Sequence, residues 1–100
     1  MIFEIIYNIN NASTIAFATV NAANIRDFVK AQCDYLKEST FKRGLSRATI
    51  SIEGRDDEWV ILFQDNHFSY IKNNGEASDR NDFCKSITSQ KKHINGHVNI

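Results

Sequence analysis

The sequence has no long hydrophobic run and no excess of charge of either sign. Its longest uninterrupted apolar stretch is Trp59–Phe63, far short of the roughly 18 apolar residues that cross a bilayer. We therefore expect no membrane-spanning helix and no membrane partner. Twelve Lys and Arg residues balance twelve Asp and Glu residues, whereas domains that bind phosphate backbones usually carry a marked basic excess. The composition argues against a general nucleic-acid binder.

The amino terminus lacks the marks of a targeting signal. Glu4 interrupts the first apolar residues, and no basic segment or small-residue cleavage site accompanies them. We interpret this segment as a strand and expect a cytoplasmic protein. A reducing compartment would leave Cys33 and Cys84 as thiols, because they are far apart in the sequence and neither has a second cysteine nearby.

Signatures of catalysis are also missing. The chain has no glycine-rich phosphate loop, no GxSxG elbow and no HExxH motif. To act as base and nucleophile, His67 and Cys84 would need an electropositive setting and a third group that orients the imidazole, and the sequence indicates neither. Cys33 and Cys84 are better explained as small buried hydrophobes. We expect no enzyme activity.

A histidine pair near the carboxyl terminus has the spacing of metal ligands. In a continuous helix, the H-x3-H pattern of His93 and His97 would place two imidazoles on one face. Gly96 lies between them where the last helix is expected to end, and only the distant Asp82 or Cys84 could add ligands. We therefore expect solvated histidines, no metal site and no cofactor.

The chain does contain several β-strand patterns. Trp59–Phe63 and Phe68–Ile71 flank a polar break at residues 64–67, which is typical of an antiparallel hairpin. Alternating or β-branched residues predict three further strands. These strands are expected at Phe3–Ile9, Thr14–Val20 and Ala48–Ile52.

A helix is predicted over residues 22–38, with Asn21 as its N-cap. Apolar residues recur there at intervals of three and four, so they form one stripe that faces a core. The inward residues are Ile25, Phe28, Val29, Cys33 and Leu36. A second helix is predicted over residues 80–92, and residues 93–100 are expected to fray.

Together these elements predict a single domain over residues 1–100. One hundred residues, of which 42% are hydrophobic, are enough for one core without disulfides or metal. The expected fold is α+β, with a five-stranded, mostly antiparallel sheet packed by one long helix. The expected order is ββα-βββ-α, which ends in the second helix.

Two charged clusters lie between the expected elements. One is a basic loop beside Phe41, and the other is an acidic turn that begins at Glu53. The acidic turn is explained by a solvated hairpin or by an epitope that meets a basic protein surface; it lacks EF-hand spacing, and Arg55 sits among the carboxylates. The candidate partner-binding residues are Lys42, Arg43, Arg47, Asp56, Asp57 and Glu58.

The aromatic residues of the hairpin keep a nucleic-acid alternative open. Exposed sheet aromatics can stack on bases, and the basic loop could contact phosphates. The glycine-aromatic consensus of RNA-recognition sheets is missing, and a five-stranded sheet needs a core. We expect most of these aromatics to pack inward. They are Trp59, Phe63, Phe68 and Tyr70.

The element order over residues 2–72 resembles the ββαβββ layout of several small phage-encoded anti-CRISPR proteins. The resemblance includes the helix that opens at Asn21–Ile25 and the strand Trp59–Phe63. Residues 79–100, with the second helix, extend beyond that layout. The resemblance implies a non-enzymatic inhibitor that binds a bacterial nuclease or defence complex through its surface. Toxin-immunity proteins have the same size and the same lack of motifs.

A protein-binding module is therefore the leading functional prediction, with a toxin-immunity protein and a nucleic-acid-binding domain as alternatives. Such modules recognise a partner through an anchor residue ringed by polar contacts. Edge strands leave backbone groups unpaired, so the protein is expected to be either a monomer or a homodimer formed by strand addition.

Overall fold

A computed structural model describes the backbone of residues 1–40 and 44–98, and the side chains of these segments as far as Ser89. The described chain is a single α+β domain with six strands, two α-helices and one 3₁₀ turn. Their bounds are β1 (Ile2–Ile9), β2 (Ala12–Thr19), the 3₁₀ turn η1 (Ala22–Asn24), α1 (Ile25–Ser39), β3 (Leu45–Ile52), β4 (Glu58–Gln64), β5 (His67–Lys72), β6 (Gly75–Glu76) and α2 (Arg80–Val98).

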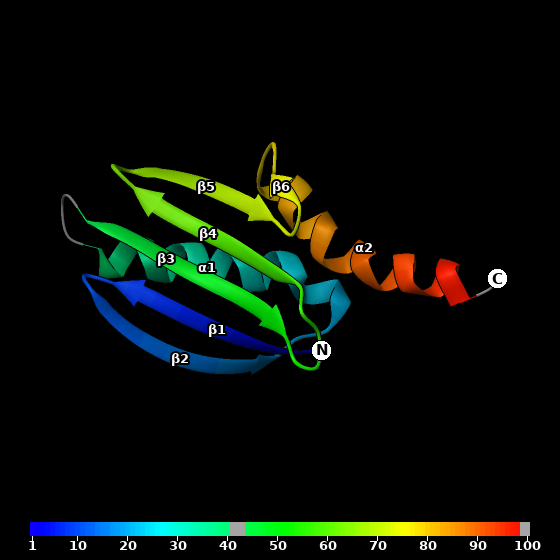
Figure 1. Ribbon diagram of the computed structural model, residues 1–100. Helices are drawn as coiled ribbons and strands as arrows, with labels where there is room; N and C mark the ends of the chain where they lie inside the picture. The colour runs from blue at the N-terminus through cyan, green and yellow to red at the C-terminus, as the bar shows by residue number, and fades with distance from the viewer. Residues whose placement is uncertain (41–43, 99–100) are drawn as a thin grey trace.

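All the strands belong to one antiparallel sheet, in the order β2-β1-β3-β4-β5-β6 (Figure 1). The fold class and the antiparallel sheet confirm the expectation from sequence, but the predicted count of five strands is wrong. The sixth strand, β6, has two residues. Its first residue, Gly75, follows Asn73 and Asn74, and this Asn-Asn-Gly sequence is typical of a turn.

The helices also differ from the prediction. α1 has 15 residues and begins at Ile25, because residues 22–24 form the turn η1. Asn21 precedes that turn, but its side chain makes no capping hydrogen bond. α2 has 19 residues and reaches Val98, so it is the longer helix. Fraying of its end in solution stays a prediction.

Two hairpin turns have the backbone angles that asparagine and aspartate tolerate. Asn10 and Asn11 join β1 to β2 with φ of 52° and 68°, and Asp65 and Asn66 join β4 to β5 with φ of 52° and 65°. Two consecutive positive φ angles match the right-handed twist of the flanking strands. The turns therefore set the register of both hairpins.

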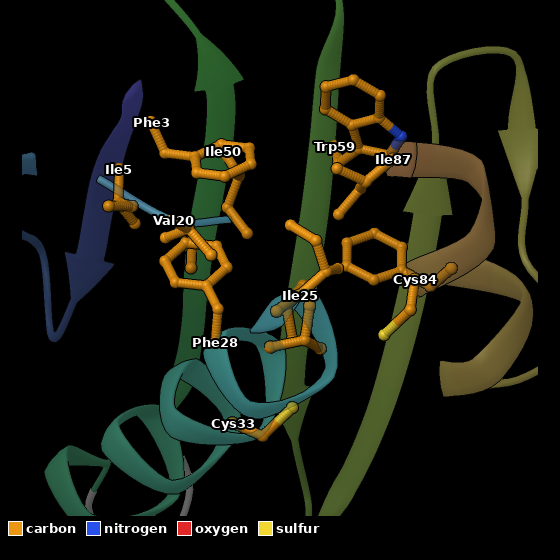
Figure 2. Packing of buried hydrophobic residues seen from close by; sticks show 14 of the residues in the cluster. Phe3, Ile5, Val20, Ile25, Phe28, Cys33, Ile50, Trp59, Cys84 and Ile87 are labelled. Carbon is orange, nitrogen blue, oxygen red and sulfur yellow. The ribbon is translucent and has the colours of Figure 1, made fainter. Parts of the chain in front are cut away.

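The core lies between one face of the sheet and the two helices (Figure 2). All five residues of the predicted α1 stripe are buried, and Phe28 stacks on Phe3 of β1 with ring centroids 4.9 Å apart. From β4, Trp59 is fully buried and donates its indole N–H to Ser86 Oγ of α2 at 3.0 Å. Lys72 of β5 forms an ion pair with Asp82 of α2 at 3.2 Å.

Both helices pack on the same face of the sheet. Residues that alternate toward them, such as Ile50 and Ile61, are buried, whereas their neighbours Thr49 and Val60 point to the opposite side. Figure 1 shows α1 along one side of the strands. Within the described residues no helix covers the other side, and no helix is long and apolar enough to cross a membrane.

Candidate interaction surface

The uncovered side of the sheet, here called the open face, carries several apolar residues. Four of them are large and well exposed. They are Ile2 (42%), Leu45 (49%), Ile15 (58%) and Phe17 (66%). Scattered exposed apolar side chains are normal on a protein surface, but contiguous ones mark interaction sites.

The strand register shows that the apolar residues are contiguous. Ile15 of β2 lies opposite Ile6 of β1, which lies opposite Thr49 of β3. Thr49 in turn pairs with Val60 of β4, and Val60 pairs with Ile71 of β5. These five side chains, here called the apolar belt, form one row across five strands; four are aliphatic, and the central one, Thr49, presents a methyl group beside its hydroxyl. Directly paired residues have Cβ atoms about 5 Å apart, so the row is continuous.

Charged residues flank the apolar belt with opposite signs on its two sides. In the row on one side, Arg47 of β3 is exposed and pairs with Asn8 and Leu62. In the row on the other side, Glu4 and Glu58 both pair with Ser51. An apolar centre with a polar and charged rim is the usual anatomy of a protein–protein interface.

The candidate residues predicted from the two charged clusters are only partly brought together. Lys42 and Arg43 lie outside the described residues, so of the basic loop only Arg47 can be placed. Asp56 is exposed in the turn, and Glu58 faces the open side of β4. Glu58 of β4 pairs with Ser51, which lies four residues after Arg47 on β3. Arg47 and Glu58 are therefore about 13 Å apart along the strand direction. They flank the apolar belt from opposite sides.

Asp57 is engaged within the fold. Its carboxylate lies 3.2 Å from Arg55 Nη2 and accepts a hydrogen bond from Asn73 Nδ2 at 3.0 Å. Asn73 Oδ1 also accepts the backbone N–H of Glu58 at 3.1 Å. These contacts join the β3–β4 turn to the β5–β6 turn, which explains why this carboxylate is less exposed than its neighbour Asp56.

The cysteines and His67 do not form a catalytic pair. His67 lies at the start of β5 and points to the open side, opposite Gln64, whereas Cys84 is buried between the sheet and α2. Burial raises the pKa of the Cys84 thiol above its ordinary value, which keeps it protonated at neutral pH. Cys33 Sγ lies 3.6 Å from Tyr70 Oη. Both cysteines are buried free thiols, as predicted.

The hairpin aromatics lie on the covered side of the sheet. Trp59 and Phe63 are buried, and Phe68 and Tyr70 pack against the core. The inward packing predicted from sequence is therefore confirmed. No group of three or more His, Cys, Asp or Glu residues in the described part of the chain could hold a metal ion. The side chains of His93 and His97 lie outside that part.

The apolar belt was not predicted from the sequence, because only one face of each strand was assigned to a core. One signal was present, however. Val60 and Leu62 alternate with Trp59, Ile61 and Phe63, so both faces of β4 are apolar. Unbroken apolar strands are typical of sheets that are covered on both sides.

Comparisons of the chain with protein-family models, with curated proteins and with solved structures find no match.

Proposed function

We propose that the protein is a non-enzymatic protein-binding module that docks on its partner through the open face. The observation that supports this proposal is the apolar belt, which crosses five strands and has no helix over it among the described elements. Burying such a row removes apolar surface from water, which is the main favourable term in protein association.

The charges beside the belt define the chemistry of the partner. Arg47 on one side favours an acidic group on the partner, and Glu4 with Glu58 on the other side favours a basic group. The matching surface is thus an apolar patch between an acidic and a basic edge. Such complementarity chiefly selects the partner and sets the orientation of docking.

Within this class, the protein acts as an inhibitor that occupies a surface of a bacterial defence complex, which is what the resemblance of residues 2–72 to small phage-encoded anti-CRISPR proteins implies. A sheet braced by two helices presents a rigid platform, and a rigid surface loses little conformational entropy on binding. The toxin-immunity alternative uses the same surface against a different class of partner.

The docking surface is tested by affinity capture with a matched pair of variants. Tagged wild-type protein, Val60→Lys and Lys37→Glu are used to capture partners from producing cells, and bound proteins are identified by mass spectrometry. Val60 is the β4 member of the belt, between Thr49 and Ile71, whereas Lys37 is exposed on α1. We expect one stoichiometric partner for wild type and Lys37→Glu and its loss with Val60→Lys. Equal capture by all three folded proteins would contradict docking through the open face.

The inhibitor class is tested in cells. Bacteria that carry an active CRISPR-type nuclease complex receive wild-type protein or Val60→Lys, and phage plaque formation is counted. We expect wild type to restore plaques and Val60→Lys to fail. If a partner is captured but no defence system is inhibited, the binding module stands and the inhibitor class is rejected. Co-expression with a captured toxin then tests the immunity alternative.

A further inference from the structure

Strand β2 is an open edge of the sheet that lacks the usual protection against strand pairing. It is eight residues long, and its sequence ASTIAFAT has no charge and no proline. Natural edge strands are normally short or carry Lys, Pro or a bulge. The opposite edge consists of short pieces: β6 has two residues and pairs with Ile71 and Lys72, which leaves only residues 67–70 of β5 beyond it.

The outward backbone groups of β2 follow from its pairing with β1. Met1 and Val20 exchange two hydrogen bonds, of 3.0 and 2.8 Å. In an antiparallel pair, hydrogen-bonded and non-hydrogen-bonded residues alternate. The even-numbered residues of β2 therefore bond to β1, and the odd-numbered ones point their N–H and C=O groups away from the sheet. The outward residues are Ser13, Ile15, Phe17 and Thr19.

We propose that two copies of the chain pair through β2, antiparallel, around a twofold axis at Ala16. In this register Ile15 pairs with Phe17 of the second copy, and Ser13 pairs with Thr19 of the second copy. All four outward residues then have a partner, and each such pair exchanges two bonds, so the junction holds about eight hydrogen bonds. An axis at Ile15 or at Phe17 would leave one end of each β2 strand without a partner.

The side chains suit this register as well as the backbone does. Ala16 of one copy would face Ala16 of the second copy at a non-hydrogen-bonded position, where the two backbones come closest and a small side chain fits. Phe17 would lie beside Ile15 of the second copy, and aromatic and β-branched residues are favourable cross-strand neighbours. Since β2 carries no charge, no like charges face each other across the axis.

A second copy fits this edge better than an unrelated peptide. Peptides that add a strand to a sheet are selected by pockets for alternate side chains, and three depressions of the described surface are lined by residues outside β2. A charged peptide would find no complementary charge there. The paired sheets would join the two open faces, so the dimer would present two apolar belts to a partner.

The test uses purified protein alone, and its result is independent of the docking function. Sedimentation velocity over a wide concentration range gives the oligomeric state of wild type and of two double variants. Ile15→Glu with Phe17→Glu places like charges opposite each other in both central pairs, whereas Ile15→Glu with Phe17→Lys places opposite charges there. Thermal unfolding by circular dichroism checks that each protein is folded.

We expect wild type to dimerise in the micromolar range, because an interface built mainly from one strand of each copy is small. The Glu/Glu variant should weaken dimerisation at least about tenfold, and the Glu/Lys variant should restore it. Amide exchange should show protection of Ile15 and Phe17 that rises with protein concentration. A wild type that stays monomeric, a dimer insensitive to the Glu/Glu change, or a Glu/Lys variant that fails to recover would each overturn the proposal.

Discussion

The buried indole of Trp59 shows how a single polar atom connects the sheet to α2. Its N–H donates to Ser86 Oγ, which itself donates to the Phe83 carbonyl at 2.6 Å. Ser86→Ala removes the acceptor and leaves the indole N–H unpaired in the core, and we expect a loss of about 1–3 kcal/mol in the free energy of unfolding. Urea denaturation measures it.

The matched control is Ser89→Ala, one turn further along the same helix, where the side chain is exposed. Changes at exposed positions usually stay within about 0.5 kcal/mol. Alanine has a higher helix propensity than serine, so propensity lowers the stability of neither variant. Equal destabilisation by both would contradict a specific role of the indole contact at Ser86.

Tyr70 and Cys84 make stability depend on pH in the alkaline range. Burial raises the pKa of Tyr70 well above its ordinary 10.0, with a further contribution from its contact with Cys33, and burial also raises the pKa of Cys84 above 9.0. Both groups keep their protons longer in the folded state. Their contribution to the free energy of unfolding is therefore complete below the unfolded pKa and is lost as pH rises toward the folded pKa.

We accordingly expect the free energy of unfolding to decline with increasing pH above the ordinary pKa of 9.0 for a cysteine thiol. Urea denaturation at a series of pH values from neutral to alkaline gives the slope. Tyr70→Phe removes one of the groups whose pKa is raised in the folded state, so its decline should be shallower than that of wild type. An unchanged slope in Tyr70→Phe would contradict the role of this phenol.

The β4–β5 hairpin depends on a residue that accepts a positive φ. Asn66 has a φ of 65°, where a Cβ atom costs about 1–2 kcal/mol for residues other than glycine and asparagine or aspartate. We expect Asn66→Val to lower the free energy of unfolding by that amount and Asn66→Gly to be tolerated. Thermal and urea unfolding measure both variants.

Asn74 provides the comparison for this change. It also lies in a turn and is exposed, but its φ is not positive. Asn74→Val should therefore change stability by no more than about 0.5 kcal/mol. A similar loss at both positions would mean that removal of the asparagine side chain, and not the backbone angle, is responsible.

Most helices and strands could be predicted from the sequence, because a local pattern of apolar or turn-forming residues specifies each of them. The alternation in β1 and β3, the stripe of α1 and the paired asparagines at residues 10–11 each report a periodicity or a turn. β6 was not accessible, since two residues carry no period. The start of α1 at Ile25 was also missed, because 3₁₀ turns are frequent at the ends of α-helices and the sequence pattern does not separate the two here.

At the scale of the whole molecule, the open face exists because both described helices pack on the other side of the sheet. Sequence patterns identify apolar positions on both faces of β4, but the number of helices on each face is a property of the tertiary structure. Of the predicted partner-binding residues, Arg47 and Glu58 lie on the open face, where the register places them on opposite sides of the apolar belt. Asp57 was predicted as a contact residue, yet it braces two turns.

The location of the hairpin aromatics favours protein binding over nucleic-acid binding. A single-strand binder needs aromatic platforms beside a basic groove, but Trp59, Phe63, Phe68 and Tyr70 face the helices. With balanced charge over the chain, we expect no gel shift of single- or double-stranded DNA or RNA at low salt and tens of micromolar protein, a concentration at which non-specific binders are usually detected. A shift that weakens steeply with salt and disappears in Arg47→Glu, but persists in Lys37→Glu, would replace the protein-binding proposal with nucleic-acid recognition by the open face.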